Sequence, residues 1–208
     1  MRAEYIDGSL WRGMVGSMTA QNALAITVSL ETGMRIGDVL RLEVSDLSDS
    51  SITYTAAKTG KQGTAQCSER LIRSLRANAV DGICFPSRKG AKSPYRSRQA
   101  VWKDVRKAAT YAGIKPHVSP HSARKTFAVD LYHRRGIGAV QEALQHKYQG
   151  TTNLYALADV QGAEYNREAM EENVYRKVLQ RLSTMLGVSI EPEEEPEPLC
   201  FTGEDDLM

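Results

Sequence analysis

The sequence predicts an α+β fold that is mainly α-helical and carries one small antiparallel β-sheet, formed by a hairpin. Apolar residues recur at helical spacing along most of the chain, and one stretch, residues 52–57, is rich in β-forming residues. The chain has 208 residues, a length that suits one domain, or one domain with short extensions. Hydrophobic residues make up 41% of it, which is enough for a hydrophobic core. No internal repeat is evident.

The first predicted helix follows a segment of uncertain character. Residues 1–16 show no clear periodicity and are interpreted as a lead-in segment. Ser17 or Thr19 can cap a helix that runs to about Thr32, and Gly33 is suited to end it. The main domain is therefore expected to begin at residue 17.

The next elements are a short helix, the hairpin and another helix. The short helix is predicted over residues 35–42. The β-rich stretch 52–57 and residues 64–67 flank a glycine-containing turn, which is typical of a hairpin. A helix over residues 68–78 follows, with Leu71, Ile72 and Leu75 on one side.

The second half of the chain is predicted to be helical. Gly113 and Pro116 end the first of its helices. The predicted helices span residues 96–111, 119–134, 137–147, 151–157 and 163–186. The domain is expected to end near residue 187, and the Glu- and Pro-rich tail over residues 188–208 is expected to be disordered.

Charge is distributed unevenly along the chain. The net charge is +2, but residues 191–208 contain eight acidic residues and no Lys or Arg. The remainder holds all 27 basic residues and 17 of the 25 acidic ones, a balance of +10. Such a body is compatible with a polyanionic partner such as nucleic acid, and equally with an ordinary basic surface.

Composition argues against several classes of protein. Residues 18–30 form the longest uncharged stretch that is also mainly apolar, and it is too short and too polar to span a membrane. The N-terminus has no signal-peptide order, so a cytoplasmic location is expected. Cys67, Cys84 and Cys200 form no C-x-x-C pair, which argues against a disulfide framework or a zinc site.

Four residues near the end of the domain form a candidate reactive group. His121 and Arg124 are three residues apart and share one face of a helix, and His146 lies nine residues before Tyr155. Such a group could bind an anion and supply a nucleophile. For a Tyr to attack a phosphodiester, its phenol must lose a proton. Fixed donors such as Arg must stabilise the negative charge that develops on the phosphate oxygens, and an acid such as Lys must protonate the leaving oxygen. This chemistry requires no metal or cofactor.

The ordered motifs resemble those of the tyrosine recombinases, the phage integrase family. The segment 31–40 with Arg35 is similar to the first-arginine box, and residues 57–60 with Lys58 resemble the catalytic-lysine turn. His121-Ser122-Ala123-Arg124 fits the H-x-x-R box. Residues 144–146, followed by Tyr155, fit the last histidine and the nucleophile. The resemblance covers about residues 17–186, the catalytic domain of the family.

The resemblance implies a role for each of these residues. Tyr155 would attack the scissile phosphate to give a 3′-phosphotyrosyl link and a free 5′-hydroxyl. Arg35 and Arg124 would hold the phosphate, Lys58 would act as general acid, and Asp38 would support the site. His121 would orient the phosphate and is a candidate acceptor for the tyrosine proton, and His146 would donate to a non-bridging oxygen.

The sequence departs from the family pattern at three points. Gln145 stands where the family usually has glycine, and Lys125 where it often has histidine. The N-terminal helical domain that clamps DNA in the family is not expected here, so the chain is either a fragment or acts without a clamp.

Several alternatives stay open. Lys61 competes with Lys58 as the acid, and Tyr148 and Tyr165 compete with Tyr155. The leading function is a site-specific recombinase for integration or excision of a mobile element. The alternatives are a DNA-binding regulator on this fold, and a type IB topoisomerase-like enzyme.

The expected partners follow from the basic surface and the resemblance. The main partner is double-stranded DNA, with a homotetramer assembled on it through the C-terminal helix, and accessory DNA-bending proteins are further candidates. The residues expected to contact DNA are Arg88, Lys89, Lys92, Arg96, Arg98 and Lys103.

Overall fold

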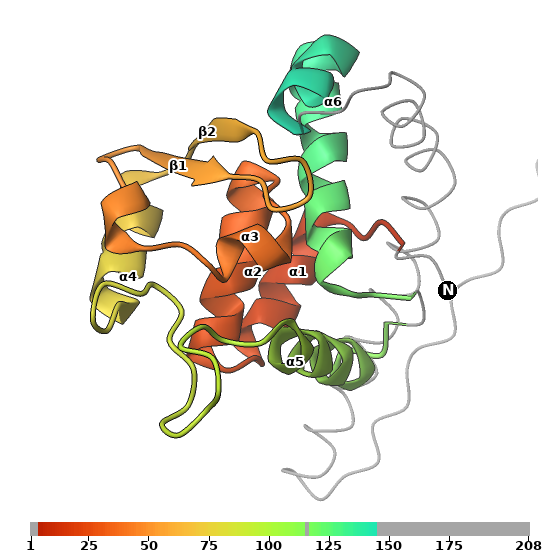
Figure 1. Ribbon diagram of the computed structural model, residues 1–208. Coiled ribbons are helices and arrows are strands. Elements are labelled where there is room, and N and C mark those ends of the chain that lie inside the picture. The colour runs from red at the N-terminus through yellow and green to blue at the C-terminus, as the bar shows by residue number, and fades with distance from the viewer. Residues whose placement is uncertain (1–3, 115–116, 145–208) are drawn as a thin grey trace, which may run out of the picture.

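The computed structural model describes residues 4–114 and 117–144, and within them the predicted class is confirmed. Seven segments are helical and two strands form one antiparallel sheet (Figure 1). The described part of the chain contains no helix that is both long and apolar enough to cross a membrane. The predicted helices 151–157 and 163–186 and the acidic tail lie outside the described residues.

Helix α2 (Ala20–Thr32) is the centre of the fold. It packs against α1 (Gly8–Gly16), α3 (Ile36–Val39), α4 (Glu69–Asn78), α5 (Arg98–Tyr111) and α6 (Pro120–Leu144). Thr19 occupies its N-cap position, as predicted, although its side chain makes no capping hydrogen bond. Gly33 ends it with φ of 68°, a left-handed conformation that glycine adopts without strain. The core is therefore built around one helix, whose C-terminal end leads directly into the α3 segment.

Helix α1 corrects the interpretation of residues 1–16 as a lead-in segment. Leu10, Trp11 and Met14 are buried in the same core cluster as α2. The Trp11 indole donates a 2.9 Å hydrogen bond to Thr126 on α6, and Asp7 caps the helix through the amide of Ser9. Three glycines obscured the pattern, but residues one and four apart are enough to make one buried face.

The hairpin consists of β1 (Ser51–Thr55) and β2 (Gln62–Gln66), as predicted. Ser51 pairs with Gln66 and Thr55 with Gln62, so the turn spans residues 56–61. Ile52 is fully buried, and Tyr54 on the same face is half-buried. The hairpin thus packs one face on the core and holds its turn beside α3, as Figure 1 shows.

The remaining helices also follow the predicted pattern. Ser68 and Ser97 cap α4 and α5 by accepting hydrogen bonds from main-chain amides. Leu71, Ile72 and Leu75 of α4 are buried together. The helix predicted over residues 35–42 is reduced to the single turn of α3, because Arg35 has an extended backbone and serves as its N-cap residue. The 3₁₀ turn η1 (Val44–Asp46) then leads into the hairpin.

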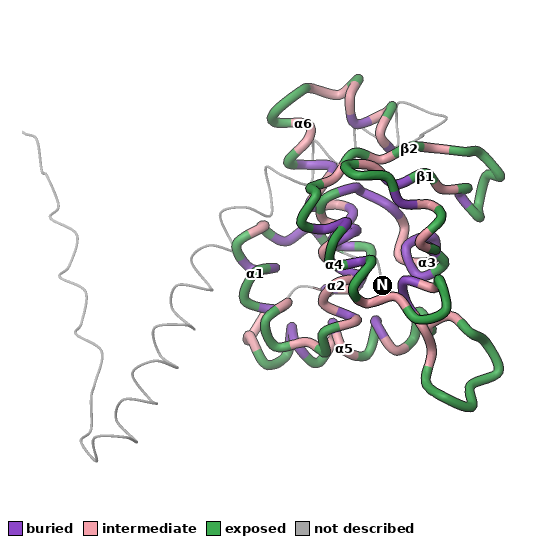
Figure 2. The backbone as a smooth tube through the Cα atoms, turned by 90° about the vertical axis from the view of Figure 1, so that its left-hand side faces the viewer, coloured by how far each residue is buried: buried purple, intermediate pink, exposed green. Residues whose placement is uncertain are grey.

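Helix α6 joins two segments that were predicted as separate helices, 119–134 and 137–147. They meet at Gly136, whose φ of 76° and ψ of −179° interrupt the helical backbone. Figure 2 shows exposed residues along the outside of the hairpin and the long loop before α5, with buried residues on the inner faces of the helices. The first part of α6 lies against α2 and presents His121 and Arg124 at its N-terminal end.

Candidate active site

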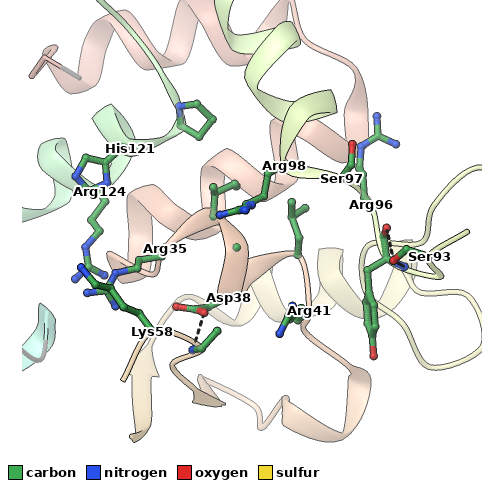
Figure 3. A pocket seen from close by; sticks show the side chains of 16 residues that line it. Arg35, Asp38, Arg41, Lys58, Ser93, Arg96, Ser97, Arg98, His121 and Arg124 are labelled. Atoms are coloured by element: carbon green, nitrogen blue, oxygen red, sulfur yellow. Dashed lines mark hydrogen bonds between the residues drawn. The ribbon is translucent and has the colours of Figure 1, made fainter. Parts of the chain in front are cut away.

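An open cavity of about 910 Å³ collects the four predicted catalytic residues that the structure describes. Its walls come from α3, the hairpin turn, the loop before α5, and the start of α6 (Figure 3). Of the described side chains that line it, six are cations and one is a carboxylate, so the cavity suits an anionic ligand. Those charged residues are Arg35, Arg41, Lys58, Arg96, Arg98, Arg124 and Asp38.

Arg124 is the most firmly held of the cations. Its side chain is 2% exposed, and its Nη1 donates to the carbonyl oxygen of Gly33 at 2.6 Å. Its Nη2 donates to the carbonyl oxygen of Leu144 at 3.0 Å. The Gly33 carbonyl lies at the C-terminal end of α2, where a positive charge is favoured. The guanidinium stays charged even when buried, so it brings a fixed positive charge to the cavity wall.

Close packing at Gly33 keeps the α2 end next to α6. A Cβ atom at this position would overlap the ring of Phe127 and would lie 2.9 Å from Cδ2 of Leu144. Glycine is therefore required here both by its positive φ and by the approach of α6. This contact brings Arg35 and Arg124, which are far apart in the sequence, to the same cavity.

Arg35 is held by its backbone. Its carbonyl accepts hydrogen bonds from the amides of Asp38 at 2.8 Å and Val39 at 3.0 Å, the first bonds of α3. Its half-buried side chain makes no hydrogen bond or ion pair with the described residues. In Figure 3 its guanidinium group lies near the guanidinium group of Arg124 and near the side chain of Lys58. Arg35 can therefore donate to a bound anion.

Asp38 links α3 to the hairpin turn. Its side chain is 6% exposed, and one carboxylate oxygen accepts a 3.0 Å hydrogen bond from the amide of Ala57. The other oxygen, Oδ2, is buried and has no hydrogen-bond partner among the described residues. An orphaned buried acceptor costs about 1–3 kcal/mol, so the position is kept at a cost to stability.

Lys58 stands one residue beyond this contact. The turn is closed by the amides of Thr59 and Gly60, which both donate to the carbonyl of Ala56. Lys58 lines the cavity, whereas Lys61, the competing candidate, is not among its lining residues. The turn thus carries an exposed ammonium group into the anion site, anchored by Asp38.

His121 lies in the first turn of α6 and lines the same cavity as Arg124. The expectation that these two residues share one face is confirmed. His121 is exposed, and Figure 3 shows its ring above the Arg124 side chain. The predicted His146 and Tyr155 lie outside the described residues.

Two neighbours of the site were missed by the sequence analysis. Burial raises the pKa of the Tyr54 phenol, and the positive charge of Arg124 opposes that shift. Asp38 and Arg35 act on the same pKa more weakly, the first raising and the second lowering it. The alternation with Ile52 is a signal that could have placed Tyr54 on the inner face. Arg41, two residues beyond α3, lines the cavity and carried no motif signal.

The basic residues predicted to contact DNA fall into separate groups. Arg96 and Arg98 line the first cavity, and a second cavity of about 670 Å³ is lined by Arg88, Arg96 and Lys103. Lys89 and Lys92 line neither of these two cavities.

Arg96 is largely occupied by contacts within the protein. Its Nε donates to Oδ1 of Asn22 at 2.5 Å and its Nη1 to Oε1 of Gln21 at 2.7 Å. Asn22 in turn donates to Asp104 at 2.6 Å, so this network ties the loop before α5 to α2. Burial, followed by the nearby charge of Arg88, lowers the pKa of Arg96. Arg96 is thus better placed to fix the loop than to bind a ligand.

Comparison with known proteins identifies the family of the chain. The model of the phage integrase family matches residues 12–161. Tyrosine recombinase XerD of Mycobacterium leprae is 31% identical over 160 residues, which cover 70% of this chain and 51% of the relative. The chain spans about half the length of the curated relatives it matches.

Solved structures share the fold. XerH site-specific recombinase bound to difH substrate aligns with a TM-score of 0.60 and 24% identity, covering 73% of this chain and 50% of that one. A lambda integrase tetramer bound to a Holliday junction aligns with a TM-score of 0.64 and 16% identity, covering 74% and 48%. At these identities the likeness establishes the fold alone, and the sequence match carries the assignment. Because the family model covers more than half of its residues, the chain belongs to the phage integrase family.

Proposed function

We propose that the protein is a tyrosine-type site-specific recombinase, which cleaves and rejoins DNA through a 3′-phosphotyrosyl intermediate. The observation that carries the proposal is the convergence of Arg35, Lys58, His121 and Arg124 on one cation-lined cavity. These residues come from three separate elements, and a chance arrangement would not gather the whole ordered set. Membership of the phage integrase family supports the same reaction.

The proposed cleavage step begins with Tyr155. Its phenolic oxygen attacks the phosphorus, the bond from phosphorus to the 5′ oxygen breaks, and a phosphotyrosyl bond forms. The tyrosine proton passes to His121, and the leaving 5′ oxygen takes a proton from Lys58. The reverse sequence with a different 5′-hydroxyl rejoins the strand, so no external energy source is consumed.

Charge stabilisation in this step is assigned to Arg35 and Arg124, with His146 donating to a non-bridging oxygen. The anchoring of Arg124 to two main-chain carbonyls supports this role, because its guanidinium needs little reorganisation as charge develops. Removing one such preorganised donor typically lowers kcat by about 10²–10³. The Asp38 contact with Ala57 supports a positioning role, since it ties the Lys58 turn to the Arg35 segment.

The proposed partner is double-stranded DNA, bound by a homotetramer whose C-terminal helices dock into neighbouring protomers. The basic residues Arg88, Lys103 and Arg98 support DNA contact. XerH bound to difH substrate supports a DNA partner, and the lambda integrase tetramer bound to a Holliday junction supports oligomerisation. Integration or excision of a mobile element in the cytoplasm, aided by accessory DNA-bending proteins, is the proposed setting.

A suicide-substrate assay tests this function. The full chain is incubated with nicked duplexes from the DNA flanking its gene, in which the strand released by cleavage diffuses away and traps the covalent adduct. We expect an adduct with the wild type and none with Tyr155→Phe, whereas Tyr148→Phe and Tyr165→Phe retain it. An adduct that survives in Tyr155→Phe would assign the nucleophile elsewhere. Sequence-specific binding without any adduct would instead identify a DNA-binding regulator, and adducts without pairing of two sites would identify a topoisomerase-like enzyme.

A further inference from the structure

Two arginines in the cavity have no place in the proposed cleavage step. Arg41 lies two residues beyond α3 and Arg98 is the first residue of α5, and both line the cavity together with the proposed catalytic residues. In Figure 3, Arg35, Lys58, His121 and Arg124 gather at one side, whereas Arg41 and Arg98 lie between that group and Ser93. The cavity therefore has a second cationic region beside the first.

The size of the cavity leaves room for a second anionic group. About 910 Å³ falls near the upper end of the range for pockets that hold drug-sized ligands, and one phosphodiester group fills only a small part of such a pocket. Consecutive phosphates of a DNA strand would bring a second charge into the same space. The cations beside the first group are then the natural partners of that charge.

Both guanidinium groups are available to a ligand. Arg41 and Arg98 are exposed, and neither side chain makes a hydrogen bond or ion pair with the described residues. Among the described residues that line the cavity, Asp38 is the sole acidic one, and its one hydrogen bond goes to Ala57. Nothing in the described part of the cavity neutralises the two arginines.

The backbone of Arg98 is held firmly. Ser97 caps α5 by accepting a 3.2 Å hydrogen bond from the amide of Ala100. Arg96, two residues before Arg98, is bonded through its amide to the carbonyl of Phe85 at 2.9 Å and through its side chain to α2. The loop and the helix start are thus fixed from both sides.

The stem of Arg98 lies across Gly37. A Cβ atom at residue 37 would be 3.4 Å from Cδ of Arg98, which is a close van der Waals contact. The stem therefore passes close over the first turn of α3, and its guanidinium lines the cavity, as Figure 3 shows. Arg98 is therefore directed at the site although it comes from a distant element.

We propose that Arg41 and Arg98 bind the phosphate next to the one that Tyr155 attacks, and so set the register of the DNA strand in the site. This inference rests on the proposed function, because the recombination reaction defines which phosphate is attacked. The two arginines are positioning residues: they contact the substrate strand but not the reacting atoms. Their effect is on where the strand lies, through charge-assisted hydrogen bonds to a neighbouring phosphate.

Neutral methylphosphonate groups test the proposal directly. Nicked duplexes, selected from a random library by binding to the full chain, carry a methylphosphonate at one phosphate near the nick, moved step by step along the strand. Affinity and adduct formation are measured for the wild type and for the double variant Arg41→Ala/Arg98→Ala. Arg73→Ala is the matched control, because Arg73 is exposed on α4 and pairs with Glu69, away from the cavity.

The expected result is loss of sensitivity at one position. In the wild type, neutralising the phosphate next to the attacked one lowers affinity by about tenfold, the effect of losing one charge-assisted contact. In the double variant that substitution has no further effect, and the slope of log affinity against log salt concentration falls in magnitude by about 0.9, one phosphate contact. Arg73→Ala keeps the wild-type profile at every position, and Arg41→Lys/Arg98→Lys recovers part of it.

The proposal is overturned if the double variant stays as sensitive as the wild type at every phosphate, or if Arg73→Ala changes the profile equally. The binding profile also separates this inference from the proposed function. A wild type that forms no adduct, but whose one sensitive phosphate depends on Arg41 and Arg98, would refute the cleavage reaction and support the second phosphate site. A wild type that forms the adduct, but whose sensitivity to each phosphate does not depend on Arg41 and Arg98, would support the cleavage reaction and refute the second phosphate site.

Discussion

Replacement of Arg124 by alanine should damage both the reaction and the fold. The substitution removes the hydrogen bonds from Nη1 and Nη2 to the carbonyls of Gly33 and Leu144, from a side chain that is 2% exposed. Each hydrogen bond from a charged donor contributes about 1.5–3 kcal/mol, so the two together contribute about 3–6 kcal/mol. Water that enters the vacated space recovers part of this. We expect the free energy of unfolding to fall by about 3 kcal/mol, out of the roughly 5–15 kcal/mol typical of a domain.

Arg35→Ala is the matched comparison. The Arg35 side chain lines the same cavity but makes no hydrogen bond or ion pair with the described residues, so its loss should change the free energy of unfolding by less than about 1 kcal/mol. Both variants should lose adduct formation by about 10²-fold or more, because each removes a donor to the phosphate. Both should keep most of their affinity for DNA, since one phosphate contact is a small part of the electrostatic total.

The assay combines two measurements. Urea unfolding is monitored by circular dichroism, and single-turnover cleavage of a nicked duplex is measured at low temperature without urea. A shift of the urea midpoint at constant slope reports stability, and cleavage is then expressed per folded molecule. An Arg124→Ala variant that unfolds at the wild-type urea midpoint would refute the anchoring role of the two carbonyl contacts. A loss of DNA affinity as large as the loss of cleavage would refute its assignment to the reaction.

Two further predictions concern buried polar groups. Asp38→Ala should lower the rate of adduct formation by about tenfold or more, because it releases the Lys58 turn. The free energy of unfolding should change by less than about 1 kcal/mol, because loss of the bond to Ala57 and removal of the orphaned oxygen offset each other. Burial raises the pKa of the Cys84 thiol from 9.0 to about 12, so Cys84 should resist alkylation at pH 8 until urea unfolds the chain. As the pH rises, the thiol of the unfolded chain loses its proton before the thiol of the folded chain. The stability that Cys84 contributes is therefore complete below pH 9 and is lost as the pH rises toward 12. Unfolding curves of the wild type and Cys84→Ala, recorded across this pH range, measure the loss.

These predictions have their own controls. Asp38→Asn keeps an oxygen for the Ala57 amide and should recover part of the activity; if it is as inactive as Asp38→Ala, the charge of Asp38 matters and the turn contact does not. Rapid alkylation of Cys84 in the folded chain, identified by peptide mapping, would contradict its burial. Equal alkaline destabilisation of wild type and Cys84→Ala would remove Cys84 from the pH dependence.

Local patterns predicted most of the helices and the hairpin. Capping residues and the spacing of apolar side chains located α2, α4 and α5, and the glycine-containing turn located the hairpin, because these signals depend on residues close in the sequence. Helix α1 escaped because its buried face rests on Leu10, Trp11 and Met14 among three glycines. The hydrogen bond of Trp11 to Thr126, which ties α1 to α6, joins residues 115 positions apart.

The candidate site shows the same division. The ordered motifs identified Arg35, Lys58, His121 and Arg124, and all four line one cavity. Arg41 escaped because nothing in the sequence indicates that the segment after α3 lines the same cavity as the start of α5. Arg96 looked like a surface cation, but its bonds to Gln21 and Asn22 exist only once the loop has folded onto α2. Tertiary contacts of this kind are set by the packing of whole elements and carry no local signal.

Identification of the residue that becomes covalently linked to DNA is the most direct test of the proposed reaction. Tyr148, Tyr155 and Tyr165 lie between Lys147 and Arg167, so they share one tryptic peptide and must be separated by fragmentation. After nuclease and trypsin digestion of the trapped adduct, mass spectrometry should place the nucleotide on Tyr155, and the released DNA strand should carry a 5′-hydroxyl. A nucleotide on Tyr148 or Tyr165, or a released strand with a 5′-phosphate, would contradict the account.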